Sequence, residues 1–136
     1  RRWRRGTPGY PGDATAPSDT LQCARRLPAL PASHPCSRVH GHSFRVELRV
    51  AGKIDPIYGW VMDFADRDAA WAGVHAALDH RYLNEISGLE NPTSENLALW
   101  LWQRLAGTLT GLAEIRAGEA HDIGCIYRGN LSHIVP

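Results

Sequence analysis

Apolar and charged positions alternate strictly along Ser43–Val50, so this segment has a period of two. One side of the alternation is apolar and the other is charged: Phe44, Val46, Leu48 and Val50 against Arg45, Glu47 and Arg49. This pattern predicts a half-buried antiparallel strand. A polar turn at 53–59 then leads to the apolar segment Trp60–Phe64, which we expect to pair with the first strand as a hairpin.

Two later segments have the three-to-four-residue spacing of helices. The first is Asp66–Leu78, where the Asp66 carboxylate suits the helix N-terminus. The second is Ser94–Leu105, preceded by Thr93 as a capping residue. Their apolar positions are Ala70, Val74, Ala77 and Leu78 in the first helix and Leu97, Trp100, Leu101 and Leu105 in the second. We expect both helices to pack on the sheet.

The order of the elements indicates an α+β domain. Two short strands, at 113–119 and 124–127, follow the helices, so strands come first, then two helices, and two strands come last. This order favours an antiparallel sheet with two helices packed on one face. The uncovered face and edges of such a sheet predict oligomerisation. We assign residues 21–129 to the domain, residues 1–20 to a disordered or atypical leader, and residues 130–136 to a short tail.

Composition agrees with one soluble globular domain, because 43% of the 136 residues are hydrophobic and 21% are charged. No apolar run approaches the roughly 18 residues of a membrane span, and no apolar stretch follows Arg1–Arg5 as in a secretory signal. The three cysteines are odd in number and widely spaced, which argues for a reducing cytoplasm rather than a disulfide framework. Four arginines and two aspartates give residues 1–20 a charge of +2, so the rest of the chain carries −1 of the total +1. This nearly neutral body gives no electrostatic footprint for nucleic acid.

The segment that enters the first long strand carries Cys36 and the motif His40-Gly41-His42. On an extended backbone the two histidines point the same way, with Cβ atoms roughly 7 Å apart, and can share one zinc ion. The alternative is that both are surface histidines before a strand. Cys36 could likewise be a small buried hydrophobic residue rather than a nucleophile. The residues alone leave these alternatives open.

Two further positions place a carboxylate where it could do chemistry. Asp79-His80 lies at the end of the first predicted helix, where the carboxylate can orient the imidazole as a general acid or base. The alternative is a histidine favoured by the helix dipole. Glu119 ends an apolar strand and could hold the guanidine-like edge of a heterocycle by two parallel hydrogen bonds. Its alternative is a solvated strand end.

Six blocks of residues occur in the order seen in relatives of 6-pyruvoyltetrahydropterin synthase, and they cover about Ala24 to Gly129. They are Arg26-Leu27-Pro28, Cys36-x-x-x-His40-Gly41-His42-Ser43-Phe44, Gly59-Trp60-Val61-Met62-Asp63-Phe64, Leu78-Asp79-His80-x-x-Leu83-Asn84, Glu90-Asn91-Pro92-Thr93-Ser94-Glu95 and Cys125-Ile126-Tyr127-Arg128-Gly129. The chain therefore resembles this family. It looks most like the bacterial 6-carboxytetrahydropterin synthases of queuosine biosynthesis, because three residues separate Cys36 from His40.

The resemblance implies a T-fold that assembles into homo-oligomeric barrels with active sites at subunit interfaces. It implies a zinc-dependent carbon–carbon and carbon–oxygen lyase that converts 7,8-dihydroneopterin triphosphate to 6-carboxy-5,6,7,8-tetrahydropterin, acetaldehyde and triphosphate. The expected partner is this small-molecule pterin triphosphate, with no nucleic acid and no membrane. A pyruvoyl-type lyase and an aldolase-type cleavage on the same scaffold are the alternatives.

The resemblance also implies how the reaction is divided among side chains. Zinc held by His40 and His42 would act as a Lewis acid on the hydroxyls of the substrate side chain. Cys36, as a thiolate, would remove a proton from the side-chain carbon. Asp79 and His80, reaching in from a neighbouring subunit, would manage protonation of Cys36 or of the leaving oxygen.

Recognition of the pterin ring would fall to a second group of residues. Glu119 would anchor the ring through its exocyclic amine and a ring N–H. Thr93 and Ser94 are the secondary contacts that the resemblance implies.

The chain departs from the family at one metal ligand. The third zinc-binding histidine of the family stands just before the Arg-Leu-Pro block, where this chain has Arg25. Arginine has no available lone pair and cannot ligate zinc. Cys23 and His34 are substitutes that the sequence offers, and a catalytically silent pterin-binding subunit is the alternative. We hypothesise that residues 1–24 are a mis-framed reading of the gene rather than a natural variant, which sequencing the source DNA checks.

Overall fold

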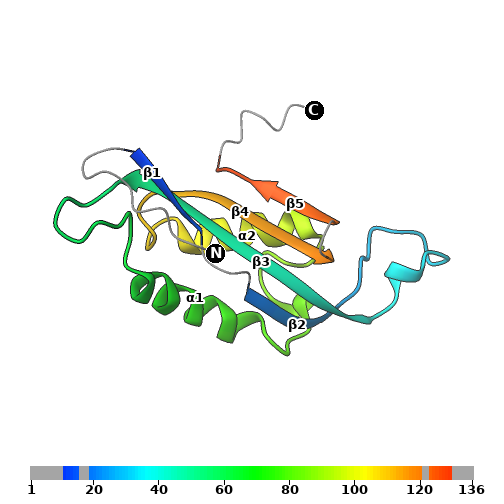
Figure 1. Cartoon of the computed structure of the whole chain (residues 1–136). Helices are drawn as coiled ribbons and strands as arrows, with labels where there is room; N and C mark the ends of the chain where they lie inside the picture. The colour runs from blue at the N-terminus through cyan, green and yellow to red at the C-terminus, as the bar shows by residue number, and fades with distance from the viewer. Residues whose placement is uncertain (1–10, 16–18, 121–122, 130–136) are drawn as a thin grey trace.

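The sheet is built around one long strand, His40–Lys53 (β3), which crosses the middle of the molecule (Figure 1). One edge of β3 pairs with Leu112–Ala120 (β4), which in turn pairs with Ile123–Tyr127 (β5). The other edge is shared by two strands. Pro11–Thr15 (β1) pairs with the second half of β3 and Asp19–Arg25 (β2) with the first half, and all pairs are antiparallel. These elements come from a computed structural model that describes residues 11–15, 19–120 and 123–129.

Part of the segment 1–20 is regular, so the expectation of a disordered leader is wrong for that part. Residues 11–15 form β1, and Asp19 and Thr20 begin β2. Residues 1–10, 16–18 and the predicted tail 130–136 lie outside the described residues. The expectation relied on apolar periodicity, whereas backbone hydrogen bonds to β3 define these strands and do not require that pattern.

The predicted strand Trp60–Phe64 is also wrong, because this segment is a turn that leads into the helix Phe64–Leu78 (α1). Local hydrogen bonds explain the difference. The Asp63 carboxylate accepts from the amide of Ala65 at 2.9 Å and so caps the helix, while Asp66 lies in the first turn instead. Gly59 has a φ of 74°, which turns the chain before the cap.

The helix Ser94–Leu105 (α2) begins and ends where the sequence predicted. The Thr93 hydroxyl oxygen accepts a hydrogen bond from the Asn96 amide at 3.1 Å, which confirms the predicted cap. Short 3-10 helices occur at Pro35–Ser37 (η1) and Leu83–Glu85 (η2). Within the described residues, no helix has the length and apolar character that crossing a membrane requires.

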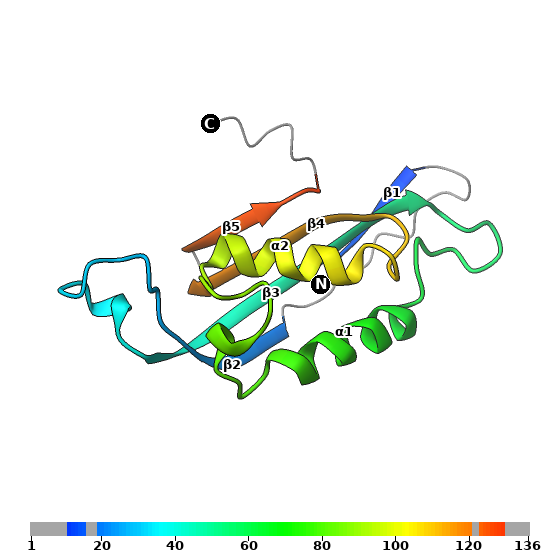
Figure 2. The same cartoon turned by 180° about the vertical axis from the view of Figure 1, so that it is seen from behind.

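Both α1 and α2 lie on one face of the sheet, so the molecule has two layers (Figure 2). The apolar face of β3 meets the apolar stripes of the helices in a single core. Its largest fully buried side chains are Phe44, Leu21, Leu48, Leu78, Leu83, Leu89, Leu97, Leu101, Leu105, Leu109, Ile115 and Val46. The predicted α+β class, with two helices on one face of an antiparallel sheet, is confirmed, while oligomerisation stays a prediction.

A buried carboxylate, Glu114, lies where β3, β4 and the end of β5 run side by side. Its oxygens lie 2.9 Å from Nε of Arg116, 3.2 Å from Nε of Arg128 and 3.4 Å from Nη2 of Arg49. Glu114 is 5% exposed, so burial alone would raise its pKa. The hydrogen bond from Arg116 and the charges of the three arginines outweigh burial and lower the pKa of Glu114.

Candidate functional site

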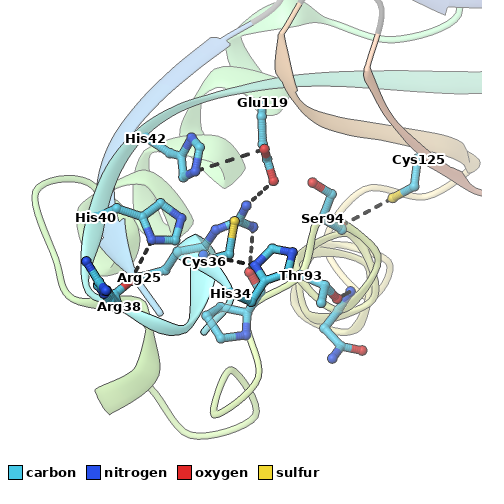
Figure 3. A network of polar contacts seen from close by, with 12 residues as sticks. Arg25, His34, Cys36, Arg38, His40, His42, Thr93, Ser94, Glu119 and Cys125 are labelled. Atoms are coloured by element: carbon cyan, nitrogen blue, oxygen red, sulfur yellow. Dashed lines mark hydrogen bonds and ion pairs between the residues drawn. The ribbon is translucent and has the colours of Figure 1, made fainter. Parts of the chain in front are cut away.

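Three strands bring two imidazoles, a guanidinium and a carboxylate together at one end of the sheet (Figure 3). Arg25 ends β2, His40 and His42 begin β3, and Glu119 lies near the end of β4. In the register of β2 and β3, Arg25 is opposite His40 and Cys23 is opposite His42. Residues that are opposite each other in an antiparallel pair point to the same face, so these side chains share one space.

The carboxylate reaches this space because Glu119 lies at an irregularity of β4. Gly118 pairs with Gly124 but Ala120 pairs with Ile123, so the register shifts by one residue at Glu119. Such a bulge re-aims the side chain that it contains. A Cβ atom at Gly118 would collide with the carbonyl of Ile123, which is why this position needs glycine.

The two histidines lie together, as their spacing predicted, with ring centroids 4.6 Å apart. Nδ1 of His40 is 2.7 Å from the carbonyl oxygen of Arg38, so this nitrogen donates and Nε2 is the one with a lone pair. Nε2 of His40 is buried and has no hydrogen-bond partner among the described residues. Burial lowers the pKa of His42, and the Arg25 guanidinium lowers it further, while Glu119 acts in the opposite direction.

Arg25 is 2% exposed, although it carries a charge. Its Nη1 donates to the carbonyl oxygen of Pro92 at 2.9 Å, and its Nη2 forms an ion pair with Oε1 of Glu119. The guanidinium carbon lies 5.0 Å from the centroid of the Phe44 ring. The other oxygen of Glu119, Oε2, is 4.0 Å from Nε2 of His42. The carboxylate predicted to hold a heterocycle is therefore already engaged by a buried arginine.

The donor atoms of this site do not fit a zinc ion as they stand. The Nε2 of His40, with its Nδ1 bonded to a carbonyl, has the arrangement of a zinc-binding histidine. Arg25, however, occupies the place of the third ligand and offers no lone pair. Among the described residues there is no group of three or more His, Cys, Asp or Glu side chains that could hold a metal ion. Zinc binding by His40 and His42 stays a prediction.

Neither substitute that the sequence offered completes the set. Cys23 does face the same side as Arg25, but its thiol is buried and donates to the carbonyl oxygen of Leu78 at 3.3 Å. Burial, followed by the charge of Asp79, raises the pKa of Cys23 to about 11, so the thiolate that zinc needs is disfavoured. Nδ1 of His34 accepts from the amide of Cys36 at 3.1 Å, which uses that lone pair.

The pair Asp79-His80 is held in a defined geometry at the end of α1. Oδ1 of Asp79 accepts from the amide of Gln22 at 2.8 Å, and Oδ2 lies 2.7 Å from Nδ1 of His80. The Gln22 bond, and next the His80 bond, lower the pKa of Asp79, so the carboxylate is ionised. His80 has a φ of 57°, and its amide donates to the carbonyl of Gln22 at 2.6 Å.

His80 and His42 contribute to the same open pocket, whose volume is about 500 Å³. Its other lining residues are Gln22, Cys23, Ala24, Gly41, Ser43, Arg81 and Tyr82. Cys36 is not among the described residues that line it. Cys36 instead lies in η1, half-buried, with its carbonyl accepting from the amide of Leu27 at 2.8 Å. Among the described residues, this pocket therefore joins His80 to His42 but does not join His80 to the Cys36 thiol.

The predicted pterin contacts Thr93 and Ser94 begin α2 and have structural partners of their own. Thr93 caps the helix, and the carbonyl of Ser94 accepts from the thiol of Cys125 at 3.2 Å. They follow Pro92, whose carbonyl bonds Arg25, so the start of α2 does lie beside the site.

Sequence reasoning missed two residues beside the dyad, Gln22, which fixes Asp79, and His75. Gln22 offered no signal, because only its backbone atoms act and they depend on the position of β2. His75 did offer one, since it is four residues before Asp79 on the same helix. Its Nε2 lies 3.8 Å from Oδ2 of Asp79.

Comparison with known proteins gives a consistent result. The family model described as 6-pyruvoyl tetrahydropterin synthase matches residues 16–130. A protein of Archaeoglobus fulgidus, provisionally named 6-carboxy-5,6,7,8-tetrahydropterin synthase, is 38% identical over 69% of this chain and 79% of its own length. A Synechocystis protein named 6-carboxy-5,6,7,8-tetrahydropterin synthase is 44% identical over 52% of this chain and 58% of its own length.

A relative with another activity in its name is equally similar. The dihydroneopterin monophosphate aldolase of Pyrococcus furiosus is 42% identical over 63% of this chain and 75% of its own length. Among solved structures, 6-pyruvoyl tetrahydropterin synthase of Caenorhabditis elegans superimposes with a TM-score of 0.78 at 23% identity, covering 91% of this chain and 98% of that chain. The fold is thus the T-fold that the sequence resemblance implied.

Proposed function

The chain belongs to the 6-pyruvoyl tetrahydropterin synthase family, and on this premise we propose that it acts as a 6-carboxy-5,6,7,8-tetrahydropterin synthase. Its substrate would be 7,8-dihydroneopterin triphosphate, and its products 6-carboxytetrahydropterin, acetaldehyde and triphosphate. Two similar proteins carry this name, which favours the carboxy product over the pyruvoyl one. The pathway would be that of queuosine and other 7-deazaguanines.

The observation that carries the proposal is the ordered dyad of Asp79 and His80, whose imidazole shares a pocket with His42. Asp79 fixes His80 through Nδ1, so Nε2 is the ring nitrogen available to exchange a proton. The His80 side chain is 78% exposed in the single chain. An exposed but oriented imidazole suits a proton-transfer group that meets the substrate of a neighbouring subunit, which is why we propose a homo-oligomer with shared sites.

The remaining roles follow from the positions of the other side chains. Cys36 would remove a proton from the substrate side chain once assembly brings His80 of another subunit near it. Glu119 would hold the pterin ring by two parallel hydrogen bonds if Arg25 released its Oε1. Thr93 and Ser94, at the start of α2, would border the ring. His40 and His42 would hold zinc, and the metal would supply Lewis acidity, only in a chain whose residue 25 could ligate it, so no role above depends on zinc.

A second candidate function is an aldolase-type cleavage of a dihydroneopterin phosphate. The similarity to the Pyrococcus furiosus aldolase favours it, and the same dyad could transfer the proton in either reaction. A third candidate is a catalytically silent pterin-binding subunit, which the Arg25–Glu119 ion pair favours. We propose the cytoplasm as the location for all three.

Product analysis by mass spectrometry separates these functions. The purified chain, Arg25→His and Arg25→His/His80→Ala are incubated with dihydroneopterin triphosphate and zinc. We expect 6-carboxytetrahydropterin from the unmodified chain and none from the third protein. Product from Arg25→His alone would mean that the scaffold is right but that the unmodified chain is catalytically silent. A pyruvoyl product, or a shortened side chain without a carboxylate, would replace the proposal with the corresponding alternative. Absence of any product from all three would indicate the silent subunit.

A further inference from the structure

The unusual feature of the site is a buried positive charge between two imidazoles and a carboxylate. We propose that the Arg25 guanidinium takes the place of a metal ion, so that this chain binds no divalent cation at His40 and His42. The same ion pair keeps Glu119 from other ligands. Arg25 then blocks both the metal position at His40 and His42 and the carboxylate of Glu119. Substitution of Arg25 alone should make both available to ligands.

The strand register places Arg25 where a side chain could complete a metal site with His40 and His42. Residue 25 is directly opposite His40, and His42 is two residues further along the same face of β3. A cross-strand neighbour has its Cβ atom about 5 Å from its partner, close enough for two imidazoles to share a small ion. Nε2 of His40 is buried and has no hydrogen-bond partner among the described residues, so one donor is already in place.

The charges of the site are balanced without a metal ion. The guanidinium and the Glu119 carboxylate form an ion pair, so the two opposite charges in the middle of the site cancel. A divalent cation would add two positive charges next to Arg25, and the nearest carboxylate is already paired. Repulsion in a buried setting is weakly screened, so it opposes binding more strongly than it would at the surface.

Arg25 is also held so that it cannot easily move away. It is 2% exposed, and its two Nη atoms bond two different segments, Pro92 before α2 and Glu119 in β4. To make room for a metal ion, the guanidinium would have to leave both partners while still buried. A buried charge without a partner is costly, so the arrangement in which Arg25 bonds Pro92 and Glu119 is favoured.

Metal content and cobalt absorption test the first half of the proposal without any substrate. The chain, Arg25→His and Arg25→Gln are loaded with Zn²⁺ or Co²⁺ and dialysed. Arg25→Gln matches Arg25→His in removing the charge but adds no imidazole. We expect Arg25→His to retain close to one equivalent, with the visible bands of a tetrahedral Co²⁺ site, and to bind at least roughly 100-fold more tightly than the other two proteins.

The unmodified chain decides the question even if a variant does not fold, which circular dichroism reports. One equivalent of zinc in the unmodified chain, lost in His40→Ala, would overturn the proposal. A folded Arg25→His that binds no metal would overturn it too.

The second half rests on the proposed function, because it concerns the pterin. Neopterin is titrated by fluorescence into the unmodified chain, Arg25→Gln and Arg25→Gln/Glu119→Gln. Release of Glu119 predicts that Arg25→Gln binds neopterin roughly tenfold more tightly than the unmodified chain, and that the double variant loses the gain. Equal affinities of all three would overturn this half. Failure of the proposed reaction would appear instead as missing product, with the metal result unchanged.

Discussion

Asp79 and Gln22 are 57 residues apart in the sequence, yet the Gln22 amide donates to Oδ1 of Asp79 at 2.8 Å. This bond, on the carboxylate oxygen that does not contact His80, fixes the plane of the carboxylate and therefore of the imidazole. It ties the dyad to β2, the strand that also carries Arg25. His80, the proposed proton-transfer group, and Arg25, the proposed metal-excluding group, thus depend on the same strand pairing.

The dyad predicts a specific loss of turnover in Asp79→Asn. The amide cannot stabilise the charged ring of His80 or fix its tautomer, so we expect kcat to fall by about 100-fold with little change in KM. Steady-state kinetics of product formation measure this, in whichever of the unmodified chain and Arg25→His is active. His75→Gln is the matched control, because it alters the weaker neighbour of Asp79 at 3.8 Å. Equal losses in both variants would contradict the assigned geometry.

The three thiols should differ in their rate of alkylation at neutral pH. Cys23 and Cys125 donate hydrogen bonds to backbone carbonyls, and burial raises the pKa of each to about 11. Because the thiolate is the reactive form, we expect iodoacetamide to modify Cys36 first. Peptide mass spectrometry over time measures the order, with the urea-unfolded chain as the control in which all three react alike. Early labelling of Cys23 would contradict the burial of that thiol.

Glu114→Gln should destabilise the fold in a pH-dependent way. Loss of the carboxylate leaves Arg49, Arg116 and Arg128 without their shared partner, which we expect to cost about 1–2 kcal/mol at pH 7 after allowance for their exposure. The folded pKa of Glu114 is lowered, so its stabilisation is full above the unfolded value of about 4.3 and is lost as pH falls through the folded pKa.

Urea unfolding of the unmodified chain and Glu114→Gln at several pH values measures this effect. The difference between the two curves should shrink as pH falls below about 4.3 and should vanish below the folded pKa of Glu114. Glu85→Gln, at an exposed position, is the control and should unfold like the unmodified chain at every pH. A difference that persists at low pH would mean that packing, rather than charge, accounts for the loss.

Thr93→Ala should lower stability even in the absence of any pterin. Its hydroxyl caps α2 through the Asn96 amide, and removal of such a cap costs about 1 kcal/mol. Thr93→Ser keeps the oxygen and should unfold like the unmodified chain. Thermal denaturation followed by circular dichroism compares the two variants. An effect of Thr93→Ala that appeared only with bound pterin would instead support the role of a ligand contact.

Features encoded by neighbouring residues were determined by the sequence alone. The alternation along Ser43–Val50 predicted β3 and its buried face, because a period of two matches the pleat of a strand. Thr93 marked the start of α2, because a capping side chain acts within one turn. The spacing of His40 and His42 placed both rings on one face for the same local reason.

The tertiary structure decided what depends on contacts between distant segments. Trp60–Phe64 is apolar enough for a strand, but the cap at Asp63 and its packing made the segment the entry to α1. Pro11–Thr15 has no apolar pattern and became a strand because the free edge of β3 supplied partners for its backbone. The sequence showed that residue 25 is an arginine where the family it resembles has a metal-binding histidine. Only the register of β2 and the bulge in β4 brought its guanidinium to Glu119, 94 residues away, since a buried charge is stable only where folding supplies the opposite one.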